Sequence, residues 1–142
     1  MGYGDDEGIN RSYSEVVTEA KKKDVDIVVA DDRTLQIDID DGLNYVNWTK
    51  NSEFLLKDIG IERWEIKESA SGYPHRHITV YLKEPADVWK RIALQACLGS
   101  HLMREALNAH RVLTGNDCPI LFFEKKGTDN ENNRIVEIED EI

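Results

Sequence analysis

The order of apolar patterns along this chain predicts a single α+β domain. Runs that alternate with a period of two indicate strands, and stretches with helical periodicity lie between them. From residue 34 onward the two kinds follow one another as β-α-β-β-α-β. This order is typical of the split βαβ core shared by ferredoxin-like and RNA-recognition-like domains. We therefore expect an antiparallel sheet with helices on one face, and an extra N-terminal helix and strand before it.

The N-terminal elements are indicated by local signals. Ser12 followed by Glu15 forms a capping-box pattern, and good helix formers follow it, which predicts a helix over residues 12–23. Two β-branched or alternating runs come next, "VDIVVA" (25–30) and "TLQIDID" (34–40). The Asp-Asp turn signal between these runs suggests that they form a hairpin.

The remaining elements complete the predicted core. A short helix should end at Gly60, and a long helical region should be either one bent helix or two, because it is broken near Gly99. The predicted elements are the helix 51–60, the strands 61–69 and 75–82, the helical region 86–113 and a last strand at 118–124.

Length and charge suggest how the chain is divided. At 142 residues it is long enough to bury one core without a metal or disulfide. We expect a flexible acidic N-terminus (1–10), one domain (11–124) and an acidic, mobile tail (125–142). The net charge is −10, and most of the excess lies at the two ends of the chain. This charge counts against nucleic-acid binding, whereas an acidic surface suits a protein partner.

The sequence also suggests where in the cell the protein is found. No apolar stretch approaches the ~20 residues that a membrane span needs, and the first ten residues are acidic rather than a basic signal-peptide region. We expect a soluble, cytoplasmic protein without a membrane partner.

Polar residues at alternate positions of two strands indicate a site. In the split βαβ topology the first and third strands lie side by side at the centre of the sheet. The period of two then sends Asp38 and Asp40 to the face opposite the helices, and the neighbouring strand adds His75 and His77 to that face. We expect this face to be open to solvent.

The residue types suggest phosphate chemistry. Two carboxylates ~7 Å apart along a strand can reach one hard cation or a close pair, and Mg²⁺ or Mn²⁺ suits such ligands. The imidazoles could bind phosphate or help to bind a softer metal. Alternating acids on a solvated strand, paired with histidines on the next, would give the same pattern. Because aspartate is a poor strand residue, two in one strand interior opposite two histidines favour the functional interpretation.

These motifs resemble those of a known family. The strand "IDID" (37–40), followed some thirty residues later by "SGYPHRHITV" (71–80), is similar to the first two motifs of the archaeo-eukaryotic primase superfamily, the primase-polymerase group. The resemblance covers roughly residues 34–124. It implies that Asp38 and Asp40 bind the catalytic metals.

The same resemblance implies how an incoming nucleotide is held. Ser71 and one of His75 and His77 would contact its phosphates, and His77 fits the strand alternation better. The catalytic set is then Asp38, Asp40 and His77. The candidate substrate-binding residues are Ser71, His75, His77 and Arg76.

The chain departs from the family pattern at its third acidic motif. Only Asp117 and Glu124 could supply that acid, and the zinc-binding and helicase modules that often accompany such cores are absent from the sequence. The leading hypothesis is a minimal, phage-type nucleotidyltransferase of DNA replication that uses nucleoside triphosphates and nucleic acid. The alternative is a non-catalytic accessory or inhibitor that binds a replication protein through its acidic surface.

For two further pairs of residues the sequence favours a structural or surface role over ligand binding. His101 and His110 lie on the second half of the long helical region and read as surface or interface residues. Arg104 and Arg111 lie seven residues apart on one helical face, as a solvated stripe or as phosphate contacts.

Overall fold

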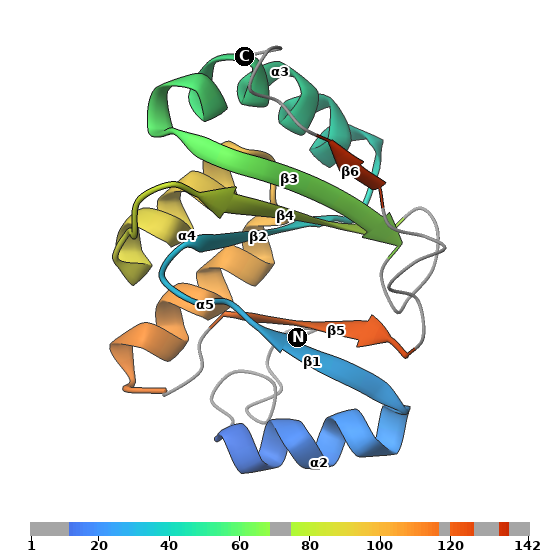
Figure 1. Ribbon diagram of the computed structural model, residues 1–142. Helices are drawn as coiled ribbons and strands as arrows, with labels where there is room; N and C mark the ends of the chain where they lie inside the picture. The colour runs from blue at the N-terminus through green and yellow to red at the C-terminus, as the bar shows by residue number, and fades with distance from the viewer. Residues whose placement is uncertain (1–11, 69–74, 117–119, 127–133, 137–142) are drawn as a thin grey trace.

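The computed structural model describes residues 12–68, 75–116, 120–126 and 134–136. It confirms an α+β fold with antiparallel sheets and an N-terminal helix (Figure 1). The elements are α2 (Tyr13–Lys23), β1 (Val25–Val29), β2 (Thr34–Ile39), α3 (Gly42–Ile59), β3 (Ile61–Glu68), β4 (Arg76–Leu82), α4 (Val88–Cys97), α5 (Leu102–Leu113), β5 (Leu121–Lys125) and β6 (Arg134–Val136). Among the described residues, no helix has both the length and the apolar character to cross a membrane.

The larger sheet contains the predicted centre. Its four strands lie in the order β2-β4-β3-β6, so the first and third strands of the predicted core are neighbours. Ile37 lies opposite Ile78, and Asp38 lies opposite His77. Strand β6 lies within the predicted C-terminal tail and pairs with β3 at the sheet edge.

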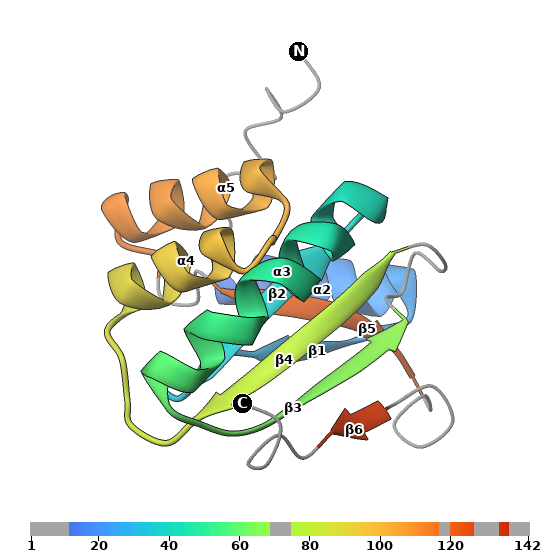
Figure 2. The same ribbon diagram turned by 90° about the horizontal axis from the view of Figure 1, so that it is seen from above.

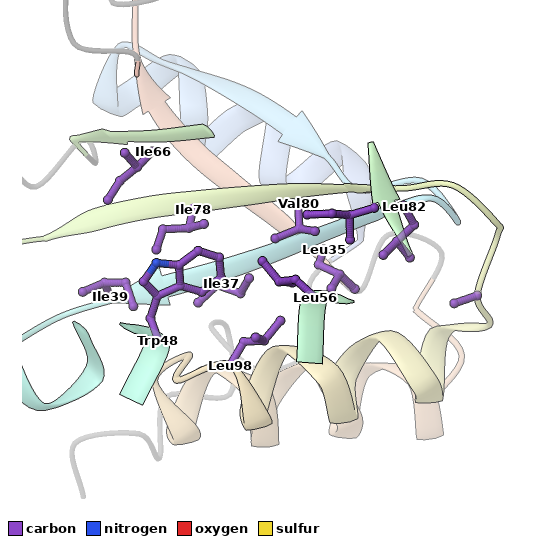
Figure 3. Close-up of a cluster of buried hydrophobic side chains, with 12 residues drawn as sticks. Leu35, Ile37, Ile39, Trp48, Leu56, Ile66, Ile78, Val80, Leu82 and Leu98 are labelled. Atoms are coloured by element: carbon purple, nitrogen blue, oxygen red, sulfur yellow. The ribbon is translucent and has the colours of Figure 1, made fainter. Parts of the chain in front are cut away.

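The apolar core fills the space between this sheet and the helices. Helices α3, α4 and α5 lie on one side of the sheet (Figures 1 and 2). Side chains from β2, β3 and β4 meet Trp48 and Leu56 of α3 and Leu98 of the α4–α5 turn (Figure 3). The sheet side of this core consists of Leu35, Ile37, Ile39, Ile61, Ile66, Ile78, Val80 and Leu82. The period-two prediction for the apolar residues of β2 and β4 is therefore confirmed.

Helix α3 is longer than the sequence predicts. It ends before Gly60, as expected, but it begins at Gly42 rather than near residue 51. The Asp41 side chain caps it by accepting a hydrogen bond from the Asn44 N–H at 2.9 Å. Glycine and asparagine disfavour helix in the first turn, and burial of Trp48 compensates for that weak local preference.

The predicted hairpin of residues 25–30 and 34–40 is wrong. Strand β1 pairs with β5 in a separate two-stranded sheet, with Ile27 opposite Phe123. The backbone N–H of Ala30 extends this ladder by donating to the Ile120 carbonyl at 3.1 Å. In Figure 1 this β1–β5 ribbon lies below the larger sheet, with α2 beneath it.

The free edge of β2 explains why neither β1 nor β5 extends the larger sheet. At this edge the backbone N–H of Gln36 donates to Oε1 of Gln95 at 2.9 Å, and Nη1 of Arg104 donates to the Gln36 carbonyl at 2.8 Å. Side chains of α4 and α5 thus occupy the hydrogen-bonding positions that a neighbouring strand would use.

A buried carboxylate organises these edge-capping side chains. Glu105 is 4% exposed, and its two oxygens accept hydrogen bonds from Gln95, Ser100, Arg104 and Asn108 at 2.7–3.1 Å. Arg104 is therefore part of an internal network rather than of a solvated stripe. Buried charges require this degree of satisfaction, because an unpaired one costs several kcal/mol.

The turn between α4 and α5 is pressed against α3. Gly99 has a φ of +97°. A Cβ placed on it would lie 2.6 Å from the backbone carbonyl oxygen of Asn44 and 2.9 Å from the backbone nitrogen of Trp48. Asn51 of α3 also donates from Nδ2 to the Cys97 carbonyl at 2.6 Å. This close approach fixes the turn relative to the sheet.

Gly99→Ala should therefore destabilise the fold by more than the ~1–3 kcal/mol expected from backbone strain alone. Chemical unfolding of purified protein measures the effect. Gly115→Ala is the matched control, since Gly115 has a φ of +80° but nothing within 4 Å of its added Cβ. Equal losses in the two variants would contradict the steric argument.

Candidate functional site

The predicted aspartates and histidines meet at one end of the central strand pair. Asp38 on β2 faces His77 on β4, with His77 Nε2 3.7 Å from Asp38 Oδ1. Asp40 follows the end of β2 and His75 precedes β4, with His75 Nδ1 3.1 Å from Asp40 Oδ1. The sequence pattern therefore correctly predicts that these four side chains come together.

The expectation that this face is open to solvent is wrong. Gln36 is fully buried, and His77 and Thr79 are only 7% and 6% exposed. The β1–β5 ribbon covers this part of the face, since Phe122 of β5 stacks on the His77 ring with 3.6 Å between ring centroids. Solvent access is retained at the strand ends, where the side chains of Asp40 and His75 are 32% and 39% exposed.

The ribbon also brings a third carboxylate to the site. Oε2 of Glu124, on β5, lies 3.4 Å from Nδ1 of His77. Glu124 also forms an ion pair with Lys67 of β3. Burial alone would raise the pKa of Glu124, but hydrogen bonds from His77 and Lys67 outweigh it and lower the pKa. Glu124 was one of the two acids considered for the third motif. The other, Asp117, lies outside the described residues.

Asp38 has the opposite electrostatic balance. Burial raises the pKa of Asp38 above its ordinary value, and the nearby charge of Asp40 adds to the rise. Arg104 and His77 oppose the shift in the pKa of Asp38 without reversing it. Two carboxylates are thus close enough to repel each other, as expected where a cation can be shared.

Asp40 has a second imidazole partner that the sequence analysis did not assign to the site. His101, at the N-cap of α5, places Nε2 3.4 Å from Asp40 Oδ2. Its proximity depends on the α4–α5 turn, because the His101 backbone N–H donates to the Asp38 carbonyl at 2.9 Å. No pairwise spacing in the sequence predicts this contact. The break at Gly99 and Ser100 is its nearest local signal.

Arg76, a further candidate, lies away from this cluster. Arg76 is on the opposite face of β4, with its guanidinium 4.1 Å from the centre of the Tyr45 ring of α3. Its buried Nε has no hydrogen-bond partner within the described residues. The structure thus separates Arg76 from His77, although the two are adjacent in sequence. Ser71 lies outside the described residues.

Asp38 and Asp40 could hold Mg²⁺ or Mn²⁺ together with a substrate rather than in a protein cage. Within the described ranges, no three His, Cys, Asp or Glu side chains form a group that could hold a metal ion. Mg²⁺, however, commonly binds through one or two carboxylates plus water and substrate phosphates. Asp38 and Asp40 provide oxygen donors of this kind.

No protein-family model matches the chain, and neither a curated protein nor a solved structure matches it.

Glu124→Gln should lower the free energy of unfolding at pH 7, by roughly 1–3 kcal/mol for the loss of buried charge-assisted hydrogen bonds. A carboxyl whose pKa is lowered on folding contributes stability above its unfolded value, which is 4.5 here, and loses it as pH falls through the folded value. The variant should therefore also show a weaker decline of stability in acid. Urea unfolding from pH 3 to 7 measures both effects.

Asp38→Asn is the comparison variant with the opposite expected sign. Because the pKa of Asp38 is raised, its charged form is unfavourable in the folded state at pH 7. The asparagine variant should be as stable as the wild type or more stable at pH 7, and this difference should disappear below about pH 4. A loss of stability like that of Glu124→Gln would refute the electrostatic assignment.

Proposed function

We propose that this domain is a minimal primase-polymerase-type nucleotidyltransferase that acts on nucleoside triphosphates with Mg²⁺ or Mn²⁺. The observation that carries the proposal is the meeting of Asp38 and Asp40 with strand histidines at one accessible end of the central strands. Clustered oxygen donors beside imidazoles suit a triphosphate with its cation.

In this proposal the residues of the site have three different roles: cation binding, phosphate contact and positioning. Asp38 and Asp40 would hold the divalent cation, which supplies charge stabilisation for the attacking hydroxyl and the departing pyrophosphate. His75 is the better phosphate contact, because its side chain is 39% exposed whereas that of His77 is 9% exposed. His77, placed between Asp38 and Glu124, would act as a positioning residue.

Glu124 is the best candidate for the third acid within the described part of the chain. It reaches the site from β5, although Lys67 and His77 already pair with it. In this proposal it orients His77 and adds negative charge near the cation.

A second candidate function is a non-catalytic replication accessory or inhibitor. The observation in its favour is that the protein's own histidines pair with the carboxylates of Asp38 and Asp40. Together with the net charge of −10, this is consistent with an acidic surface that binds a replication protein. In that case the Asp/His cluster stabilises the fold and has no catalytic role.

Manganese binding and primer extension distinguish the two candidates. Calorimetry should detect Mn²⁺ binding to the wild type and none to the Asp38→Asn/Asp40→Asn double variant. Primer extension and unprimed synthesis with Mg²⁺ or Mn²⁺ should fall by orders of magnitude in either single variant, because the cation supplies most of the charge stabilisation.

Asp41→Asn is the matched control for these variants. It removes a neighbouring carboxylate but keeps a good N-cap residue for α3, so metal binding and synthesis should be unchanged. Equal Mn²⁺ binding in the double variant, or wild-type synthesis by Asp40→Asn, would refute the enzymatic proposal. Absence of synthesis in the wild type under all conditions would favour the accessory role.

A further inference from the structure

His101 is placed so that its imidazole lies at the accessible end of the site. Its Nε2 is 3.4 Å from Asp40 Oδ2, and its side chain is 32% exposed. His110, on the last turn of the same helix, forms no ion pair with Asp38 or Asp40 within the described residues. The two helix histidines, which the sequence could not tell apart, therefore have different surroundings.

Hydrogen bonds to β2 hold the backbone at His101 in place. Its backbone N–H is bonded to the Asp38 carbonyl, and the preceding Ser100 accepts a hydrogen bond from the Asp38 N–H at 2.9 Å. Ser100 is itself bonded to the buried Glu105. The contacts that close the edge of β2 thus also fix the position of this imidazole.

The side chain of His101 does not cap the helix that begins after it. His101 is the N-cap residue of α5, but it makes no side-chain capping hydrogen bond. The N-cap residues of α3 and α4, Asp41 and Asp87, both do. Serine, threonine, aspartate or asparagine would stabilise α5 better at this position. The imidazole is turned instead toward Asp40.

Asp40 holds two imidazoles, one on each oxygen. Oδ1 contacts Nδ1 of His75 at 3.1 Å, and Oδ2 contacts Nε2 of His101 at 3.4 Å. The second ring nitrogens, Nε2 of His75 and Nδ1 of His101, have no hydrogen-bond partner among the described residues. Among the described residues, each ring is therefore oriented by Asp40 through one nitrogen, and its other nitrogen is not engaged.

We propose that His101 and His75 form a phosphate-binding pair oriented by Asp40, and that the pair contacts the triphosphate of the substrate. An imidazole has two ring nitrogens, so each ring can keep its contact with Asp40 through one nitrogen and place the other against a phosphate oxygen. A carboxylate has about four acceptor sites, so these contacts leave Asp40 capacity for a cation. The identification of the ligand as a nucleoside triphosphate rests on the proposed function. The pairing of the two imidazoles does not.

Nuclear magnetic resonance of the imidazole groups tests this pair. Inorganic tripolyphosphate, and separately dATP with Mg²⁺, should shift the ring signals of His75 and His101 along one saturation curve, while those of His110 stay unchanged. His101→Asn and His75→Gln should each weaken tripolyphosphate binding on the order of tenfold, the loss of one charge-assisted hydrogen bond. His110→Gln is the matched control and should bind as the wild type does.

In His101→Asn, α5 should remain folded, because asparagine is a preferred N-cap residue. Thermal unfolding of each variant confirms this independently. His101→Gln, which lacks that capping advantage, should give the same loss of binding.

The outcomes separate this inference from the proposed function. If dATP binds and primers are extended while His101→Asn behaves as the wild type, the His101 assignment is wrong and the enzymatic proposal stands. If tripolyphosphate binds through both histidines but no synthesis occurs, the pair is confirmed and the enzymatic proposal fails. If neither ligand shifts the His75 and His101 signals, the phosphate-binding pair is overturned.

Discussion

The buried carboxylate of Glu105 is the constraint on which the rest of this structure depends. It accepts hydrogen bonds from Gln95, Ser100 and Arg104, and these three side chains satisfy the free edge of β2. An exposed strand edge normally pairs with another strand, and this one does not because side chains of α4 and α5 occupy its donors and acceptors. The position of the β1–β5 ribbon follows from that closure.

Closing the edge of β2 also builds the candidate site. The ribbon cannot extend the sheet, so it folds over the face that carries the polar residues and places Phe122 and Glu124 beside His77. The α4–α5 turn, held to β2 by Asp38, places His101 beside Asp40. The site therefore combines the ends of two central strands with Phe122 and Glu124 of the ribbon and His101 of the α4–α5 turn.

Burial divides this cluster into an inner and an outer part. The inner part, His77 with Glu124, is nearly closed to solvent, which suits positioning and electrostatic tuning. Asp38, whose side chain is 20% exposed, lies between this part and the outer one. The outer part, Asp40 with His75 and His101, is accessible and is where a ligand could bind. The same residue types thus serve different purposes, because burial determines which of them can meet a ligand.

The sequence alone determined the α+β class, most element positions and the placement of Asp38 and His77 on one face of neighbouring strands, because period-two alternation fixes which residues share a strand face. It also located the break between α4 and α5 at Gly99. Tertiary structure decided the partner of β1, the early start of α3, the covering of His77 and the arrival of His101. Each of these depends on contacts between segments far apart in the chain, such as Gln36 with Gln95 or His77 with Glu124. Local propensity and periodicity carry no information about such contacts, since they are set by packing and by the need to satisfy buried polar groups.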